Sequence, residues 1–247
     1  MMDRSSNNQP QALKPPEALM RAIAQDLRPV KPAPQPLLLA LRMVPLALLV
    51  SSVILLAIGP RPDTGILGPL LTWGASAAQF VVAIVLIWIA AHEGTPAGRL
   101  PRQMVYSAAV VASLVVVFLT LLTFSTSPVS ETLGVSVWIA NKTVHVSPWI
   151  MGFACGIGST LFGGILVLFF SWVFRNSLAT RPTVAGALYG AGAGLAINAG
   201  WRIACPLSTP GHALGAHGAA IIATVILGAL IGRSLGNRGL HVGSRGS

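Results

Sequence analysis

Six long apolar stretches constrain the fold of this 247-residue chain more than any other feature of its sequence. A helix needs about 20 apolar residues to cross a hydrocarbon layer about 30 Å thick. Only 9% of the residues are charged and 53% are hydrophobic, whereas a soluble domain carries roughly a quarter charged residues. The six expected spans are Leu37–Gly59, Leu67–Ala91, Met104–Phe124, Pro148–Phe174, Pro182–Cys205 and Pro210–Leu235.

These stretches predict an all-α integral membrane protein, with a bundle of six transmembrane helices in residues 37–235. Residues 1–36 form a separate N-terminal arm, made of a disordered tract, a short amphipathic helix and a proline-rich linker. Residues 236–247 form a basic tail. The first apolar stretch lacks the small-residue cleavage pattern of a signal peptide, so we expect it to remain as an anchored helix.

The distribution of basic residues predicts how the bundle is oriented. If the N-terminus is inside, thirteen of the 16 Lys and Arg residues lie on the inner side. Inner loops of membrane proteins carry such an excess, so both termini are expected in the cytoplasm. The net charge of +10 does not predict a nucleic-acid partner, because the basic residues are spread over the span ends and form no patch with aromatic residues.

The stretch "NAGWRIACPLSTPGHALGAHGAA", residues 198–220, combines a cysteine and two histidines at the expected outer face. The second cysteine, Cys155, lies seven residues after Pro148, just as His217 lies seven residues after Pro210. At 1.5 Å per residue, both side chains lie about 10 Å into their helices. We therefore expect a site at the outer ends of the fourth, fifth and sixth spans.

Thiol and imidazole groups suit soft or borderline metal ions, and an ionisable residue inside a span is a functional candidate. The candidate metal ligands are Cys155, Cys205 and His217, with His212, Arg202 and His145 as auxiliary residues. Arg202 precedes Cys205 by one helical turn, where a guanidinium favours the thiolate. No cofactor is expected to be obligatory, and a metal ion would bind transiently.

A disulfide between the two cysteines requires Cα atoms within about 7 Å of each other. The helix count places Cys205 nearer the surface than Cys155, which counts against a disulfide. Glycines at four-residue spacing predict close helix packing. They are Gly186, Gly190 and Gly194 on the fifth span and Gly152 and Gly156 on the fourth.

The arm contains a short amphipathic pattern. Leu19, Ile23 and Leu27 recur every fourth residue between Pro16 and Pro29, which predicts a helix with one apolar face. So short a helix is marginal alone in water. Its apolar face either folds into a groove of a partner protein or lies on the inner leaflet, and the residues alone leave both open.

From about Ala18 onward the chain resembles the NrsF family of bacterial membrane anti-sigma factors, which regulate an extracytoplasmic-function sigma factor negatively. The resemblance rests on "ALMRAIAQDLRPVKP", on "MGFACGIGS" and, most specifically, on "ACPLSTPGHALGAHGAA". It implies an inner-membrane protein that is not an enzyme and that uses its arm to hold the sigma factor away from RNA polymerase. Cys155 and Cys205 would sense heavy metals or oxidants and release the sigma factor. The expected sigma-factor contacts are Leu19, Ile23, Asp26, Leu27, Arg28, Pro29 and Val30.

Three other classes of membrane protein share some of these features. The main alternative is a transporter or metal-binding permease with a Cys/His outer site. A rhomboid-type protease would use Ser159 and His217, but Ile157 stands where its glycine is required, and the helix count keeps this serine and histidine apart. A thiol oxidoreductase would relay electrons between cysteine pairs, which two isolated cysteines cannot do.

Overall fold

The computed structural model describes residues 16–26, 35–95, 99–126, 135–139, 142–174 and 181–242. The chain divides into two units, residues 1–33 and residues 34–247. The first unit contains helix α1, and the second contains every other described element.

Helix α1 spans Glu17–Asp26, within the segment for which the sequence predicts a helix. It begins directly after Pro16, and an exposed ion pair joins Arg21 Nη2 to Glu17 Oε2 at 3.7 Å. Leu19 and Met20 are 50% and 53% exposed, so α1 presents apolar side chains to its surroundings. The expected sigma-factor contacts Leu27, Arg28, Pro29 and Val30 lie outside the described residues, as do the side chains of Ile23 and Asp26.

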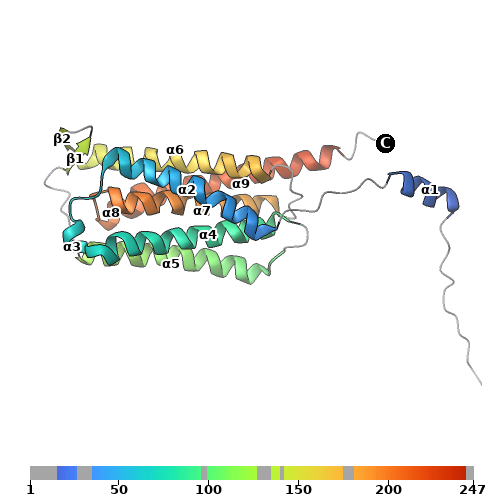
Figure 1. Ribbon diagram of the computed structural model, residues 1–247, viewed down its shortest axis with the longest axis horizontal. Coiled ribbons are helices and arrows are strands. Elements are labelled where there is room, and N and C mark those ends of the chain that lie inside the picture. The colour runs from blue at the N-terminus through green and yellow to red at the C-terminus, as the bar shows by residue number, and fades with distance from the viewer. Residues whose placement is uncertain are drawn as a thin grey trace, which may run out of the picture. The chain divides into compact units, whose positions relative to one another are not determined.

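The second unit is dominated by long helices that lie side by side (Figure 1). Its elements are α2 (Pro36–Ile58), α3 (Thr64–Pro69), η1 (Leu70–Gly74), α4 (Ala75–Glu93), α5 (Arg102–Thr126), β1 (Val135–Ile139), β2 (Lys142–Val146), α6 (Pro148–Phe174), α7 (Pro182–Ala204), α8 (Pro210–His212), η3 (Ala213–His217) and α9 (Gly218–Val242). The elements η1 and η3 are π-helices.

The prediction of an all-α chain is confirmed for the body of the described unit, and strands β1 and β2 add one hairpin to it. They pair antiparallel, from Val135 opposite Val146 to Ile139 opposite Lys142, between the third and fourth expected spans. Both strands are rich in valine, whose β-branched side chain favours extended backbone. The hairpin therefore adds a small sheet to an otherwise helical unit.

Five of the described helices are long and apolar enough to cross a membrane, by length and composition. They cover Pro36–Ile58, Thr64–Glu93, Arg102–Thr126, Trp149–Phe174 and Pro210–Asn237. The sixth long helix, α7, has 23 residues but is rich in glycine and includes Asn198 and Arg202. The chain is thus a protein of apolar membrane-type helices, and the count of six spans stays a prediction.

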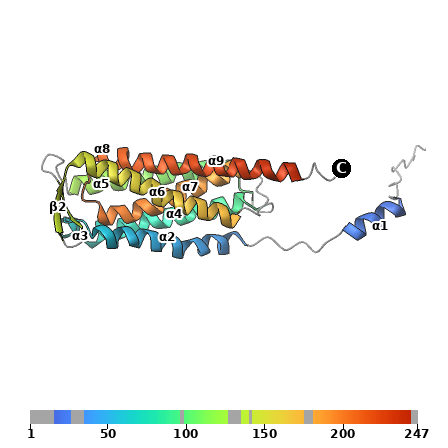
Figure 2. The ribbon, with the colours of Figure 1, turned by 90° about the horizontal axis from the view of Figure 1, so that it is seen from above.

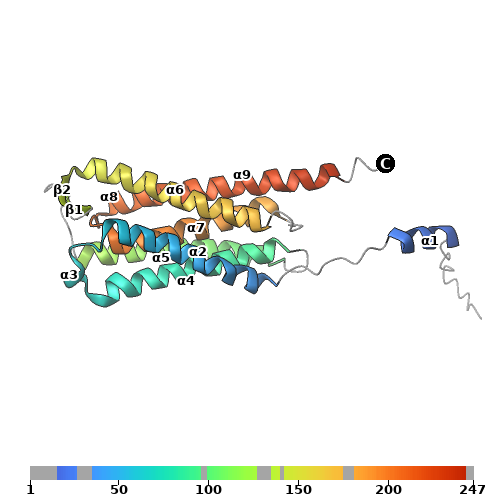
Figure 3. The same ribbon diagram turned by 45° about the horizontal axis from the view of Figure 1, so that its top comes forward.

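The position of α7 explains its composition. It packs against α9, α4, α6 and α2, and Figures 1 and 3 show it between α6 and α4. Side chains of these neighbours bond its carbonyl oxygens: Gln79 Nε2 donates to Leu195 O at 3.2 Å and Ser51 Oγ donates to Ala196 O at 3.0 Å. Because α7 contacts protein on most of its surface, it does not need the large apolar side chains of a lipid-facing helix.

The predicted close packing of glycines is confirmed where α7 crosses α9. A Cβ atom added to Gly186 would collide with the carbonyl oxygen of Gly228, and one added to Gly190 would collide with that of Thr224. The two backbones are in direct contact, as glycine-rich faces permit in membrane helices. Gly194 continues the contact, since a Cβ there would lie 2.6 Å from Thr224 Oγ1.

Two predicted spans differ in detail from the helices observed. The second is interrupted, because Gly68 has a φ of 68° and is followed by Pro69. A positive φ favours glycine, so α3, η1 and α4 follow one another across this kink. The last helix runs to Val242, seven residues past its expected end at Leu235. Isolated glycines such as Gly236 do not end a helix on their own.

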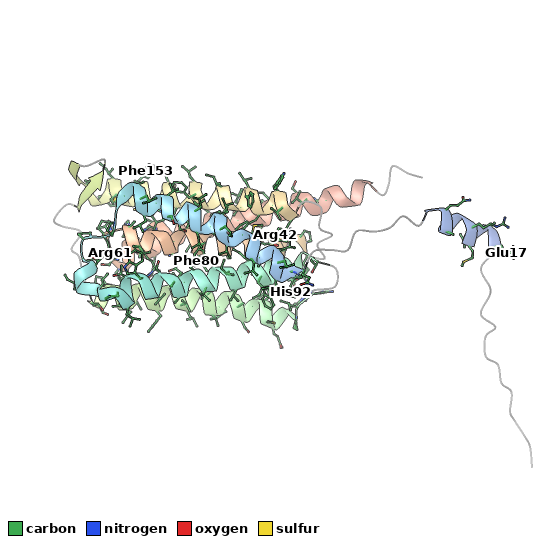
Figure 4. All side chains as sticks on the ribbon, viewed as in Figure 1. Glu17, Arg42, Arg61, Phe80, His92 and Phe153 are labelled. Atoms are coloured by element: carbon green, nitrogen blue, oxygen red, sulfur yellow. The ribbon has the colours of Figure 1, made fainter. Side chains whose placement is uncertain are left out.

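The start of α2 and the end of α9 lie at the same end of the bundle (Figures 1 and 2). Arg42 and His92 lie toward this end, which we call the terminal end (Figure 4). The β1–β2 hairpin and Arg61 lie toward the opposite end, which we call the hairpin end. The described part of the bundle therefore begins and ends at the same end.

Candidate functional site

Four buried cysteine and histidine side chains meet inside the bundle. Cys155 comes from α6, Cys205 follows α7, His212 ends α8 and His217 ends η3. One ligand atom from each residue lies within 4.8 Å of the other three. The two Sγ atoms are 3.7 Å apart, and Cys205 Sγ lies 3.2 Å from His212 Nε2. No side chain of this Cys/His cluster is more than 7% exposed.

The Cys/His cluster lies toward the hairpin end of the bundle. Cys205 and His217 line a small cavity of about 30 Å³ together with Arg61, and Arg61 lies at that end in Figure 4. His92 lies toward the opposite end, where its ring packs edge-on against Trp88 with centroids 4.6 Å apart. The structure thus separates His92 from His212 and His217.

The segment after α7 brings Cys205 to Cys155. Helix α7 ends because Pro206 disfavours helical backbone at the preceding residue, and Cys205 is extended, with φ −76° and ψ 122°. Residues 205–208 are all buried, so the chain stays inside the bundle instead of leaving for the surface. The helix count that kept the two sulfurs apart is therefore wrong, because it treated Cys205 as a surface position.

The π-helix η3 brings the two histidines together. On an α-helix, residues five apart point in directions about 140° apart, which separates His212 from His217. A π-helix bonds each residue to the one five positions back, and here the Gly218 N–H donates to Ala213 O. The extra residue in the turn places both rings on one face, with centroids 5.1 Å apart.

Ser159 and Trp201 complete the surroundings of His217. Ser159 Oγ lies 3.3 Å from His217 Nδ1, which contradicts the expectation that this serine and histidine are too far apart to meet. The Trp201 ring packs against the His217 ring with centroids 5.7 Å apart. These contacts hold the imidazole in one orientation toward the cluster.

The two glycines of α6 provide room for the histidine segment. A Cβ atom added to Gly156 would lie 3.6 Å from Ala216 O, and one added to Gly152 would lie 3.5 Å from His212 Nδ1. Helix α6 therefore passes directly alongside η3. This close approach sets Cys155, on the same helix, opposite the two imidazoles.

Arg202 is directed toward α5. Its Nη2 donates to Leu119 O at 3.1 Å and to Thr123 Oγ1 at 2.6 Å. It lines the same small cavity as Cys205, but a guanidinium has only donors and cannot itself ligate a metal. His145 lies in β2 opposite Ser136, and its side chain lies outside the described residues.

Sequence reasoning left His212 out of the main ligand set. The observed grouping shows why: a helical template of 3.6 residues per turn places the two histidines on different faces. The only signal for their meeting is the spacing of five residues in "HALGAH", which matches the period of a π-helix.

Long apolar helices and a buried cluster of two thiols and two imidazoles place the chain among helical membrane proteins that carry metal-ligating side chains within the bundle. The chain belongs to the NrsF family, described as negative regulator of sigma F, whose model matches residues 23–236. The resemblance seen in the sequence is thus confirmed, and family membership makes the chain a negative regulator of a sigma factor. Neither a curated protein nor a solved structure matches it.

Proposed function

We propose that the chain is an inner-membrane anti-sigma factor. Its arm holds an extracytoplasmic-function sigma factor on the cytoplasmic side, and the thiols of Cys155 and Cys205 on the outer side sense a metal ion or an oxidant. The family match over residues 23–236 carries the sigma-factor assignment. The cluster of buried thiols at the end of the bundle far from the terminal end supports the sensing role.

The distribution of arginines supports the orientation. Arg42 lies toward the terminal end, as Figure 4 shows, and Arg102 begins α5 after the connection from α4. Basic residues near span ends mark the cytoplasmic side. The terminal end then faces the cytoplasm, where a sigma factor acts, and the Cys/His cluster faces the periplasm.

The exposed apolar side chains of α1 support its role as the binding segment. Leu19 is half exposed in a helix of ten residues, which is too short to be stable alone in water. Ile23 lies on the same face by its spacing of four. An amphipathic helix of this kind gains stability by laying its apolar face into a hydrophobic groove, and the sigma factor would supply that groove.

Helix α7 offers a route by which the thiols can act on the arm. Cys205 directly follows α7, and α2 contacts α7 through the hydrogen bond from Ser51 to Ala196. A Cβ atom added to Gly200 would lie 3.1 Å from Ser51, so the backbones of α2 and α7 are in close contact there. Because the arm precedes α2, a new arrangement at the thiols would change how the arm is presented. Inverting a 1:99 population requires a difference of about 5.5 kcal/mol between the two states.

The arm is tested by charging its apolar face. We expect full-length protein carrying Leu19→Glu and Ile23→Glu to lose copurification of the sigma factor, because two carboxylates would have to enter an apolar groove. The matched control carries Ala24→Glu and Gln25→Glu, which add the same charge to exposed positions on the other side of α1. Equal recovery of the sigma factor by both variants would contradict the assignment of the arm.

A further inference from the structure

The distance between the two sulfurs fits shared coordination of one ion. Bonded sulfurs in a disulfide are about 2.05 Å apart, but here they are separated by 3.7 Å. Two thiolates that each lie about 2.3 Å from a tetrahedral zinc ion are about 3.8 Å apart. The cluster thus already has the sulfur spacing that a tetrahedral ion requires.

The imidazoles are oriented as metal ligands are. His212 directs Nε2 toward Cys205 Sγ at 3.2 Å. His217 places Nδ1 at 3.3 Å from Ser159 Oγ, which leaves Nε2 for an ion. A ligating histidine usually bonds an outer partner through its second nitrogen, and that partner fixes the ring. Ser159 occupies this outer position.

The charge of the ligand set selects the class of ion. Two thiolates neutralise a divalent cation, and a neutral complex avoids the penalty of a net charge in a buried site. Two sulfurs and two nitrogens in tetrahedral arrangement suit zinc-like ions, whereas magnesium and calcium require oxygen ligands. Cadmium shares the divalent charge and the preference for sulfur.

A groove of about 380 Å³ lies beside the cluster, between α6 and η3. Its lining includes the exposed side chains of Trp149 and Phe153 and the ring of His212. Because His212 is a member of the cluster and also a wall of the groove, an ion that enters along the groove meets this imidazole first.

We propose that Cys155, Cys205, His212 and His217 form one four-ligand site for a divalent zinc-class ion, and that capture of this ion is a signal to which the protein responds. The inference rests on the proposed function, because it assigns a ligand to the proposed sensor. Binding removes one proton from each thiol, so each ion captured releases two protons. His212 and His217 are then as necessary for the metal response as the cysteines.

The histidines should separate metal sensing from oxidant sensing. A peroxide oxidises the two thiols to a disulfide and is itself reduced, so that hydrogen peroxide yields two water molecules. This step forms one sulfur–sulfur bond and uses no imidazole as a ligand. A histidine variant should thus lose the response to cadmium and keep the response to peroxide.

The test measures binding of zinc and cadmium to the full-length protein in detergent, in competition with a chelator and without a sigma factor. Loss of an outer partner typically costs about 10–100-fold in metal affinity. We expect a loss in this range for Ser159→Ala and a larger loss for His212→Ala and His217→Ala. The control His92→Ala, at the opposite end of the bundle, should not change the affinity.

The inference and the proposed function fail in different ways. Unchanged cadmium affinity in both His212→Ala and His217→Ala would overturn the four-ligand site, even if the sigma factor still copurifies with the protein. Retained peroxide induction shows that a histidine variant is folded, so its lost cadmium response is then a ligand effect. Tight, histidine-dependent metal binding by a protein that retains no sigma factor would support the site and contradict the proposed function.

Discussion

Replacing Cys155 or Cys205 by serine should abolish stress-induced activity of the sigma factor and leave repression in unstressed cells unchanged. Serine is close in size to cysteine, so the buried positions stay filled. Its hydroxyl neither forms a disulfide nor offers the soft sulfur ligand that zinc and cadmium prefer. Each cysteine supplies one of the two sulfurs that lie 3.7 Å apart, so either single change should remove the whole response.

This prediction is measured with a reporter gene under a promoter that the sigma factor controls, before and after addition of cadmium or peroxide. Ala154→Ser is the matched control, because it adds the same hydroxyl one position from Cys155 on α6 and keeps both thiols. Normal induction in either cysteine variant would show that the thiols take no part in sensing. Loss of repression at rest would indicate instead a defect in folding or in holding the sigma factor.

Gly190→Ala should destabilise the bundle strongly although it adds a single methyl group. The new Cβ would collide with the carbonyl oxygen and carbon of Thr224, which belong to the backbone of α9 and cannot rotate away. Overpacking a core typically costs about 1–3 kcal/mol. At a contact between two backbones, the helices must separate along their length, so we expect a loss at or above the upper end of this range.

The matched control for this change is Gly218→Ala, which lies at the start of α9. A Cβ atom at Gly218 meets no atom within 4 Å, and alanine favours a helix over glycine by up to about 1 kcal/mol. Gly218→Ala should therefore be neutral or stabilising. Thermal unfolding in detergent measures both, and equal melting temperatures for the two variants would contradict the close contact of α7 with α9.

The apolar stretches predicted the helices well because their boundaries depend on local signals. Pro148 and Pro182 stand at the first positions of α6 and α7, where proline is preorganised for a helix. The central position of α7 could not be predicted from the sequence. The glycine spacing indicates that helices pack closely but does not identify which helices are in contact. The β1–β2 hairpin was missed although Val135, Val137 and Ile139 recur every second residue, because an alternation over only five residues is short beside the flanking apolar spans.

The candidate site could be predicted in part. The two cysteines and His217 were predicted as candidates because ionisable groups are rare within apolar spans. His212 did not join them, because its place depends on one extra residue in the turn of η3. The meeting of Cys205 with Cys155 depends on a buried segment after Pro206, and a count of helical rise does not describe such a segment.

Several buried polar groups away from the cluster had no sequence signal at all. Glu93 is fully buried at the end of α4 and accepts a hydrogen bond from the Leu100 N–H at 3.0 Å, while Arg181 Nη1 lies 3.5 Å from its other oxygen. Gln79 is also fully buried and bonds α7. A polar residue within an apolar stretch is identified as a structural link only when its partner on another helix is known.

The most direct measurement of the central claim is the partition of the sigma factor between membrane and soluble fractions of the cell. At rest, we predict that the sigma factor sediments with the membranes in cells carrying the wild-type protein or Cys155→Ser. After addition of cadmium, it should move to the soluble fraction in the wild type and stay with the membranes in the variant. A sigma factor that is soluble at rest, or that moves equally in both strains, would contradict the account.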